Sequence, residues 1–301
     1  MYKSSNNVKA YLFLTLAALF WSGNFIVGKV ASFYNIPPFS LNFYRWFFAF
    51  LILLTFTYQE VINNKDYILK NKGLFIALGI TSITIFNSIV YYSLYYTQVI
   101  SGILMISTIP VWILFFASVL KIEKTNIFQI SGVILSLTGV LFIITKADIK
   151  LIKELEFNKG DLSMVIGMLS WAIYSALLRK KIHPISQIGL LEIIIICGFI
   201  FLIPIYFIEM SLGSKIVLGL PFILTLSYVV LFPGLFAFLF WIKGIDIIGA
   251  NRSGVFLHLM TIFGALMAIV ILGEKFMFYH FLGAIFIIAG ITLSNKVKKN
   301  A

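Results

Sequence analysis

The stretches EKTNIFQISGVILSLTG, residues 123–139, and EKFMFYHFLGAIFIIAG, residues 274–290, decide the fold. Each begins with Glu-Lys and carries glycines nine and sixteen positions later. The constant offset of 151 residues indicates that the second half of the chain duplicates the first. Each copy is predicted to contain five membrane spans. An odd number of spans turns the second copy upside down, so the pattern indicates inverted repeats, a construction that secondary transporters often use.

The composition requires lipid as the solvent of this chain. Mean hydropathy is +1.03, 61% of residues are hydrophobic and only 11% are charged, whereas a soluble domain carries about 25% charged residues. The net charge is +12, but the basic residues lie in short gaps between apolar runs, where topology signals occur. We therefore expect a bilayer and no nucleic acid as partner. The single cysteine, Cys197, lies in an apolar run and is predicted to be a buried, inert thiol.

Apolar runs predict ten transmembrane helices. A helix needs about 20 residues to cross about 30 Å of hydrocarbon. The run 73–120 is too long for one crossing and is predicted to be two helices with a turn near residues 97–101. The other spans are predicted at residues 10–28, 40–58, 125–145, 162–178, 193–208, 216–242, 253–273 and 276–295.

We therefore predict an all-α integral membrane protein of ten transmembrane helices, arranged as two inverted five-helix repeats. The first repeat is assigned to residues 1–146 and the second to residues 160–301. Residues 147–159 are predicted to be a mixed-charge linker with a short interfacial helix. Ten spans put both termini on one side, which also holds 15 of the 23 Lys and Arg residues. Both termini are thus expected in the cytoplasm of a bacterial cell, with the protein in the inner (plasma) membrane.

Landmark residues resemble those of the EamA-like branch of the drug/metabolite transporter superfamily. They are Ala18 to Phe25 with Lys29, Phe43-Tyr44-Arg45, Tyr95-Tyr96-Thr97, Glu123 with Gly132, Gly160-Asp161, Ser170 to Tyr174, and Leu272 to Lys275. The resemblance implies two inverted repeats around a central cavity. It also implies export or exchange of small metabolites such as amino acids, across the inner membrane in bacterial members.

Trp21 and Asn24 are candidate substrate-binding residues of the first span. They lie one helical turn apart and share a face. A polar group inside the bilayer is costly, so it tends to face a cavity or a partner. Asn24 offers a donor and an acceptor to a zwitterion, and the alternative is an interhelical hydrogen bond of about 0.6 kcal/mol.

Two further stripes are candidates for the same cavity. Asn87, Tyr91 and Tyr95 recur every four residues on the third span. Trp171, Tyr174 and Ser175 form the counterpart face of the sixth span. The alternative for the tyrosines is a role as interfacial anchors at the membrane surface.

Four ionisable residues are candidates for charge recognition or coupling. His258 of the ninth span is a candidate contact for substrate or proton, and its alternative is a hydrogen-bonded structural residue. Lys29 and Arg45 either extend to the membrane surface or attract a substrate carboxylate at the cavity mouth. Glu192 accepts a coupling proton, pairs with a neighbouring helix, or is held at the surface by residues 179–181.

Glycine and proline residues are assigned mainly structural roles. The glycines of the repeated stretches, Gly132, Gly139, Gly283 and Gly290, are predicted to allow close helix packing. Pro110 and Pro233-Gly234 can free backbone groups that line a cavity. They do not occupy equivalent positions in the two repeats.

The sequence predicts a secondary carrier that works by alternating access on a small-molecule substrate. It contains no P-loop, no His-Glu-x-x-His and no Gly-x-Ser-x-Gly, so we expect no enzyme activity, catalytic residue, cofactor or metal site. A monomer is expected. The alternatives are a flippase for a lipid-linked substrate and, from another class, a membrane enzyme or scaffold with a non-transporting pocket.

Overall fold

The computed structural model describes residues 2–97, 99–148, 158–180, 185–272 and 275–296. Helices are the only regular secondary structure among these residues. The first five spans are α1 (Tyr2–Phe33), α2 (Pro38–Asn63), a third span made of α4 (Lys72–Gly79), η1 (Ile80–Phe86) and α5 (Asn87–Tyr96), a fourth made of α6 (Val99–Ile106) and α7 (Ile109–Val119), and α8 (Ile127–Ile144). A short helix, α3 (Lys65–Lys70), joins the second span to the third.

The second half repeats this order of elements. Its spans are α10 (Lys159–Leu177), α11 (Gln187–Ser211), the composite of α12 (Leu220–Val229), η2 (Val230–Phe236) and α13 (Ala237–Ile248), the composite of α14 (Ala250–Gly254), η3 (Val255–His258) and α15 (Leu259–Leu272), and α16 (Phe278–Ser294). Eight described helices are long and apolar enough to cross a membrane. The other two spans are the divided ninth and the 17-residue α16. The ten-helix prediction is confirmed, including the turn after Tyr96.

Several predicted span boundaries were wrong, and the seventh and eighth spans show a common reason. The seventh span was expected over residues 193–208, but α11 begins at Gln187 because Ser186 caps it by accepting from the backbone N–H of Gly189 at 3.1 Å. The eighth span was expected over residues 216–242, but it begins at Leu220 and continues to Ile248. Charge-free runs cannot include Glu192, Lys243 or Asp246, although all three lie within helices. The interfacial helix expected in the linker falls on residues 149–157, which lie outside the described residues.

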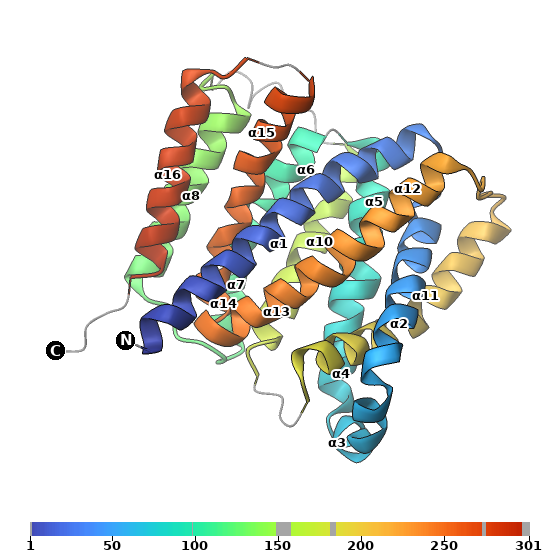
Figure 1. Cartoon of the computed structure of the whole chain (residues 1–301). Coiled ribbons are helices and arrows are strands. Elements are labelled where there is room, and N and C mark those ends of the chain that lie inside the picture. The colour runs from blue at the N-terminus through green and yellow to red at the C-terminus, as the bar shows by residue number, and fades with distance from the viewer. Residues whose placement is uncertain (1, 98, 149–157, 181–184, 273–274, 297–301) are drawn as a thin grey trace.

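The two repeats interlock through reciprocal contacts between counterpart helices. The first turn of α1 and the end of α16 lie on the same side of the bundle (Figure 1). Helix α8 packs against its counterpart α16 at one edge, and α2 packs against its counterpart α11 at the opposite edge (Figure 1). The first span of each repeat also packs on the third span of the other, as α1 on α13 and α10 on α5. The core therefore lies between the repeats rather than within either one.

Glycines set the distance between α8 and α16. A Cβ atom added to Gly132 would lie 2.6 Å from the carbonyl oxygen of Gly290, and one added to Gly139 would lie 2.5 Å from that of Gly283. Both distances are too short for any larger side chain. The close packing predicted for these four glycines is confirmed, and their antiparallel pairing follows the inversion of the repeats.

Two glutamates cap the paired helices α2 and α11 from opposite ends. Glu209, near the end of α11, accepts from the backbone N–H of Ser40 at 2.6 Å at the start of α2. Glu60, near the end of α2, accepts from the hydroxyl of Ser186 at 2.7 Å at the start of α11. A carboxylate at a helix N-terminus satisfies free N–H groups and the helix dipole. Each repeat thus fixes the start of its partner's second span.

Candidate functional site

A small internal cavity lies between the two repeats, with a volume of about 20 Å³. Four of the predicted site residues line it: Trp21, Asn24, Asn87 and Trp171. The other lining residues are Phe25, Phe86, Val90, Ile106, Ile109, Leu257 and Met260. One water molecule needs about 10–15 Å³ measured in this way, so the cavity has room for a water molecule and none for a metabolite. The centre of the helix bundle is therefore closed to a substrate in this structure.

Aromatic rings form one wall of this cavity. The indoles of Trp21 and Trp171 meet edge to face, with ring centroids 5.1 Å apart. Phe238 and Trp241 pack on Trp21 at 5.9 and 5.4 Å. The Nε1–H of Trp21 donates to the carbonyl oxygen of Pro233 at 3.1 Å. This bond joins the first span of one repeat to the third span of the other.

Three buried polar side chains form a hydrogen-bonded chain beside the cavity, which we call the latch. Arg45 donates from Nη1 to the hydroxyl of Tyr91 at 2.7 Å. Tyr91 donates in turn to Oδ1 of Asn24 at 2.9 Å. The three residues come from α2, α5 and α1, so the latch ties together three spans of the first repeat. Of these residues only Asn24 lines the cavity.

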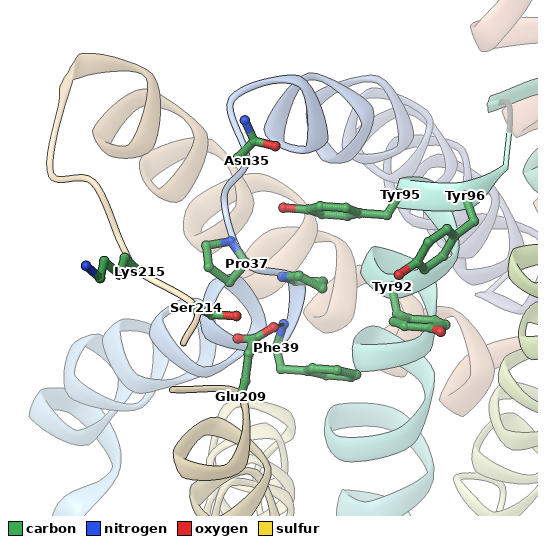
Figure 2. Close-up of a pocket in the computed structure, with 10 residues that line it drawn as sticks. Asn35, Pro37, Phe39, Tyr92, Tyr95, Tyr96, Glu209, Ser214 and Lys215 are labelled. Carbon is green, nitrogen blue, oxygen red and sulfur yellow. Dashed lines mark hydrogen bonds between the residues drawn. The ribbon is translucent and has the colours of Figure 1, made fainter. Parts of the chain in front are cut away.

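A larger pocket of about 420 Å³ opens on the side away from the first turn of α1. Tyr92, Tyr95 and Tyr96 come from the end of α5 and lie opposite the segment that leads into α2 (Figure 2). Tyr95 donates its hydroxyl to the carbonyl oxygen of Ile36. The carboxylate of Glu209 and the ammonium of Lys215 add one charge of each sign to the pocket wall.

The predicted stripe on the third span leads from this outer pocket to the centre. Tyr95 lines the outer pocket, Tyr91 holds the latch one turn further in, and Asn87 lines the cavity. The three side chains therefore share a face but occupy three different sites. Tyr91 lies between Asn87 and Tyr95 along this face of α5.

The sixth-span stripe is brought to the cavity only in part. Trp171 lines it, whereas Tyr174 and Ser175 are fully buried outside it. Ser175 accepts from Nε1 of Trp241 at 3.3 Å. The hydroxyl of Tyr174 has no hydrogen-bond partner among the described residues. This geometry gives both side chains packing roles in the closed conformation.

His258 is held by hydrogen bonds at both ring nitrogens. Nδ1 lies 2.6 Å from the hydroxyl of Ser136, and Nε2 lies 2.8 Å from the carbonyl oxygen of Ser107. Ser107 is also the residue that corresponds to His258 in the first repeat. The bond therefore joins the equivalent breaks in the fourth and ninth spans, as expected of a structural histidine.

The three remaining candidates lie in different surroundings. Lys29 donates from Nζ to the carbonyl oxygens of Leu94 at 2.8 Å and Thr97 at 2.9 Å, and so caps the end of α5. Arg45 is fully buried in the latch rather than extended to the surface. Glu192 is also fully buried, and neither carboxylate oxygen has a hydrogen-bond partner among the described residues. Burial rules out the alternative that Glu192 is held at the surface by the basic cluster.

Both repeats carry irregular helical turns at equivalent positions. The prolines had indicated otherwise, because Pro110 and Pro233 do not occupy equivalent positions in the two repeats. The π-helical segments Ile80–Phe86 and Val230–Phe236 are offset by 150 residues. Only the second contains a proline. In the first, Asn87 donates from Nδ2 to the carbonyl oxygen of Ser82 at 2.6 Å, which satisfies a group near the irregular turn. The Ser/Thr cluster at residues 81–84 was the available sequence signal, since such side chains compete with the helix for backbone groups.

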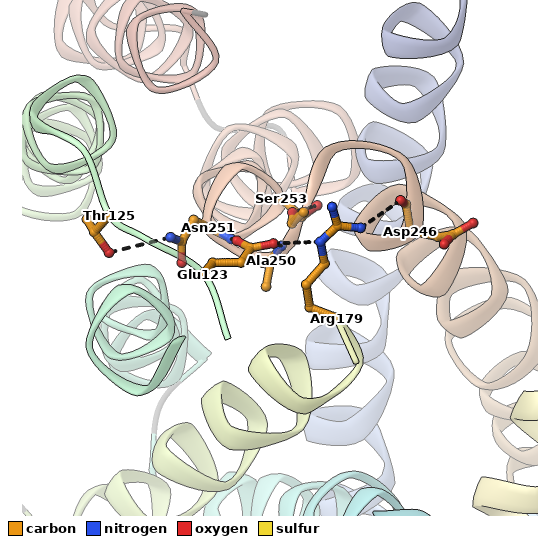
Figure 3. A network of polar contacts seen from close by, with 8 residues as sticks. Glu123, Thr125, Arg179, Asp246, Ala250, Asn251 and Ser253 are labelled. Atoms are coloured by element: carbon orange, nitrogen blue, oxygen red, sulfur yellow. Dashed lines mark hydrogen bonds and ion pairs between the residues drawn. The ribbon is translucent and has the colours of Figure 1, made fainter. Parts of the chain in front are cut away.

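A polar network lies on the side of the bundle that holds the first turn of α1. Glu123 forms an ion pair with Nε of Arg179 at 2.9 Å and accepts from the backbone N–H groups of Ala250 at 3.1 Å and Asn251 at 3.0 Å (Figure 3). Arg179 also donates to the carbonyl oxygen of Asp246 at 3.1 Å. The network joins the fourth and sixth spans to the eighth and ninth. It lies across the membrane from the outer pocket.

A family model for the EamA-like transporter family matches the chain twice, over residues 8–145 and residues 158–296. The chain belongs to the EamA-like transporter family. It is similar to the uncharacterized transporter YyaM of Bacillus subtilis, with 24% identity over 97% of this chain and 95% of that protein. It is also similar to an uncharacterized transporter of Archaeoglobus fulgidus, with 26% identity over 96% of this chain and 98% of that protein. A solved crystal structure shares the fold, with a TM-score of 0.71, 15% identity and coverage of 94% and 95% of the two chains.

These findings make the protein an integral membrane protein related to transporters. Transporters built from inverted repeats bind substrate at the interface between the repeats, near the middle of the membrane. The cavity between the two repeats lies at such an interface. Among the described residues there is no group of three or more His, Cys, Asp or Glu side chains that could hold a metal ion.

Proposed function

We propose that the protein exports or exchanges small polar metabolites, amino acids or related compounds, by alternating access around the cavity between its repeats. The observation that carries the proposal is the polar-aromatic cavity at the repeat interface. We propose that the latch closes it on one side and the Glu123–Arg179 network on the other. Indole rings supply apolar area, and the amides of Asn24 and Asn87 supply donors and acceptors.

The closed centre is an argument for alternating access. A cavity of about 20 Å³ must expand before it can take a metabolite, because ligand sites in proteins usually measure about 300–1,000 Å³. The outer pocket, at about 420 Å³, is already within this range. We propose that opening of the latch joins it to the cavity. Opening the opposite side requires that the Glu123–Arg179 ion pair separates.

The proposed orientation puts both termini in the cytoplasm of a bacterial cell. It rests on the excess of Lys and Arg in the loops of that side. The outer pocket then faces away from the cytoplasm, and the Glu123–Arg179 network forms the cytoplasmic gate. Export requires that this gate opens first to admit substrate.

Glu192 is the proposed site of any proton coupling. It is fully buried without a hydrogen-bond partner among the described residues. An ionised carboxylate is costly in such surroundings, so a proton exchanged at this side chain could drive a change of conformation. His258 is less suited, because both of its ring nitrogens are already engaged.

Counterflow in proteoliposomes tests the proposal. Purified protein is reconstituted with a panel of unlabelled amino acids and related metabolites inside, and uptake of each labelled compound is followed. Saturable uptake that is stimulated by internal substrate is expected, and Asn24→Leu is expected to lower it by at least about tenfold, since a buried polar group is left unpaired. Phe56→Leu is the control, because Phe56 is 78% exposed on the lipid side of α2. Folded protein that exchanges no compound of the panel contradicts the proposal.

A further inference from the structure

Arg45 is a buried cation that uses only part of its hydrogen-bonding capacity. Its side chain has no exposed surface, and Nη1 donates to Tyr91 at 2.7 Å. Nε and Nη2 have no partner among the described residues. A guanidinium has five N–H donors, one on Nε and two on each Nη. The three N–H groups on Nε and Nη2 are therefore without an acceptor among the described residues.

The unused atoms form one edge of the guanidinium. Nε and Nη2 carry the parallel N–H groups that bind a carboxylate with two hydrogen bonds. Arg45 forms no ion pair with a described carboxylate. The surrounding rings compensate the charge in part, with the guanidinium carbon 4.8 Å from the ring centroid of Trp46 and 6.0 Å from that of Phe238. An unpaired cation at this depth is costly to maintain, which is typical of a functional side chain.

Lys29 is another cation on this side of the first repeat, and it lacks this free capacity. Its Nζ donates to two backbone carbonyl oxygens, those of Leu94 and Thr97. Removing these bonds would leave the end of α5 uncapped. The two cations that the sequence could not distinguish therefore differ in the structure.

Arg45 is connected to the cavity by side chains that contact both. Through Tyr91 it is one hydrogen bond from Asn24, which lines the cavity. Phe238 packs on the ring of Trp21 as well as on Arg45. A Cβ atom at Gly234 would lie 3.4 Å from Nε of Arg45 and 2.8 Å from the carbonyl oxygen of Val229, so the absence of a side chain at this position lets η2 pack closely beside the free edge.

We propose that Arg45 binds the carboxylate of the transported substrate through Nε and Nη2, and that Tyr91 holds the guanidinium in place while the site is empty. The inference rests on the proposed transport function and names its substrate class: small metabolites with a carboxylate. When the latch opens, Arg45 becomes accessible from the outer pocket and the cavity. The substrate carboxylate then supplies the acceptor that the closed conformation lacks.

The test is counterflow with carboxylic acids and their primary amides. The panel pairs neutral L-amino acids and 2-hydroxy acids with the amide of each, so that shape is kept and charge is removed. Acids are expected to exchange at least about tenfold faster than their amides, the effect of losing one charge-assisted hydrogen bond. Arg45→Gln is expected to abolish this preference, and Arg45→Lys to weaken it, because an ammonium lacks the two-donor edge. Lys29→Gln, which removes a charge on the same side, is expected to keep the preference.

Each outcome bears on the inference. Amides that exchange as fast as acids, or an Arg45→Gln or Arg45→Lys protein that keeps the full preference, overturn it. Exchange of amides or amines without any acid overturns it but leaves the proposed transport function standing. A wild-type protein that exchanges nothing overturns both. Size-exclusion profiles and thermal unfolding in detergent establish that each variant is folded, and loss of acid exchange with amide exchange retained distinguishes lost recognition from lost protein.

Discussion

Removing one hydroxyl group from Tyr91 should open the route between the outer pocket and the cavity. Tyr91→Phe keeps the ring but removes both hydrogen bonds of the latch, from Arg45 at 2.7 Å and to Asn24 at 2.9 Å. A hydrogen bond to a charged group contributes about 1.5–3 kcal/mol and a neutral one about 0.5–1.5 kcal/mol. The lower end of their sum, about 2 kcal/mol, corresponds to an increase of about 30-fold in the open population.

A cysteine that lines the cavity can report this increase. Val90 lines the cavity and is 2% exposed, so Val90→Cys is slow to react with a charged thiosulfonate in the closed conformation. The measurement is made in a Cys197→Ala background, since Cys197 is the one native cysteine. Labelling rates of the purified protein are compared with and without Tyr91→Phe. The expected change is an increase of about 30-fold when opening and closing are fast relative to labelling.

Tyr174→Phe is the matched control. Tyr174 is also fully buried, but its hydroxyl has no hydrogen-bond partner among the described residues. The same chemical change there breaks no described bond and should leave the labelling rate unchanged. An unchanged rate in Tyr91→Phe, or an equal increase in both variants, would refute the latch.

Three further predictions concern packing, capping and coupling. Gly290→Ala should lower the free energy of unfolding by about 1–3 kcal/mol, the usual range for overpacking, because the new Cβ would lie 2.5 Å from the carbonyl oxygen of Gly132. Thermal unfolding in detergent checks this. Gly73→Ala is the control, because nothing lies within 4 Å of a Cβ atom at that position. Glu60→Gln should lower the free energy of unfolding by about 1 kcal/mol, because the start of α11 loses a charged cap. An unaltered melting temperature would contradict this. Glu192→Gln should leave counterflow intact while abolishing stimulation of transport by a pH gradient; stimulation that persists would exclude this carboxylate as the proton site.

Several features of the site were accessible from the sequence because they depend on hydropathy and on local spacing. Trp21, Asn24, Asn87 and Trp171 were identified as polar or amphipathic groups at membrane depth, and all four line one cavity. The cost of placing such groups against lipid makes them face the protein interior. The pattern could not indicate that Tyr95, on the same stripe, lies in a separate outer pocket.

Partner choice could not be predicted for the ionisable residues. Lys29 and Arg45 look alike in the sequence, but one caps a helix and the other keeps a free guanidinium edge. His258 and Glu192 were both possible proton sites, and only the histidine has its polar atoms engaged. Each difference depends on atoms of other helices.

By itself, the sequence determined that this chain is a bundle of ten membrane helices and that its two halves are related by duplication. Span length is set by the thickness of the bilayer, and the repeated Glu-Lys and glycine pattern can be read along one dimension. Only the tertiary structure decided which polar side chains meet, for example that Tyr91 bonds to Asn24, 67 positions away, and not to a neighbour on its own helix. The physical reason is that in lipid a buried polar group takes whichever partner the packing of distant helices brings within hydrogen-bond distance.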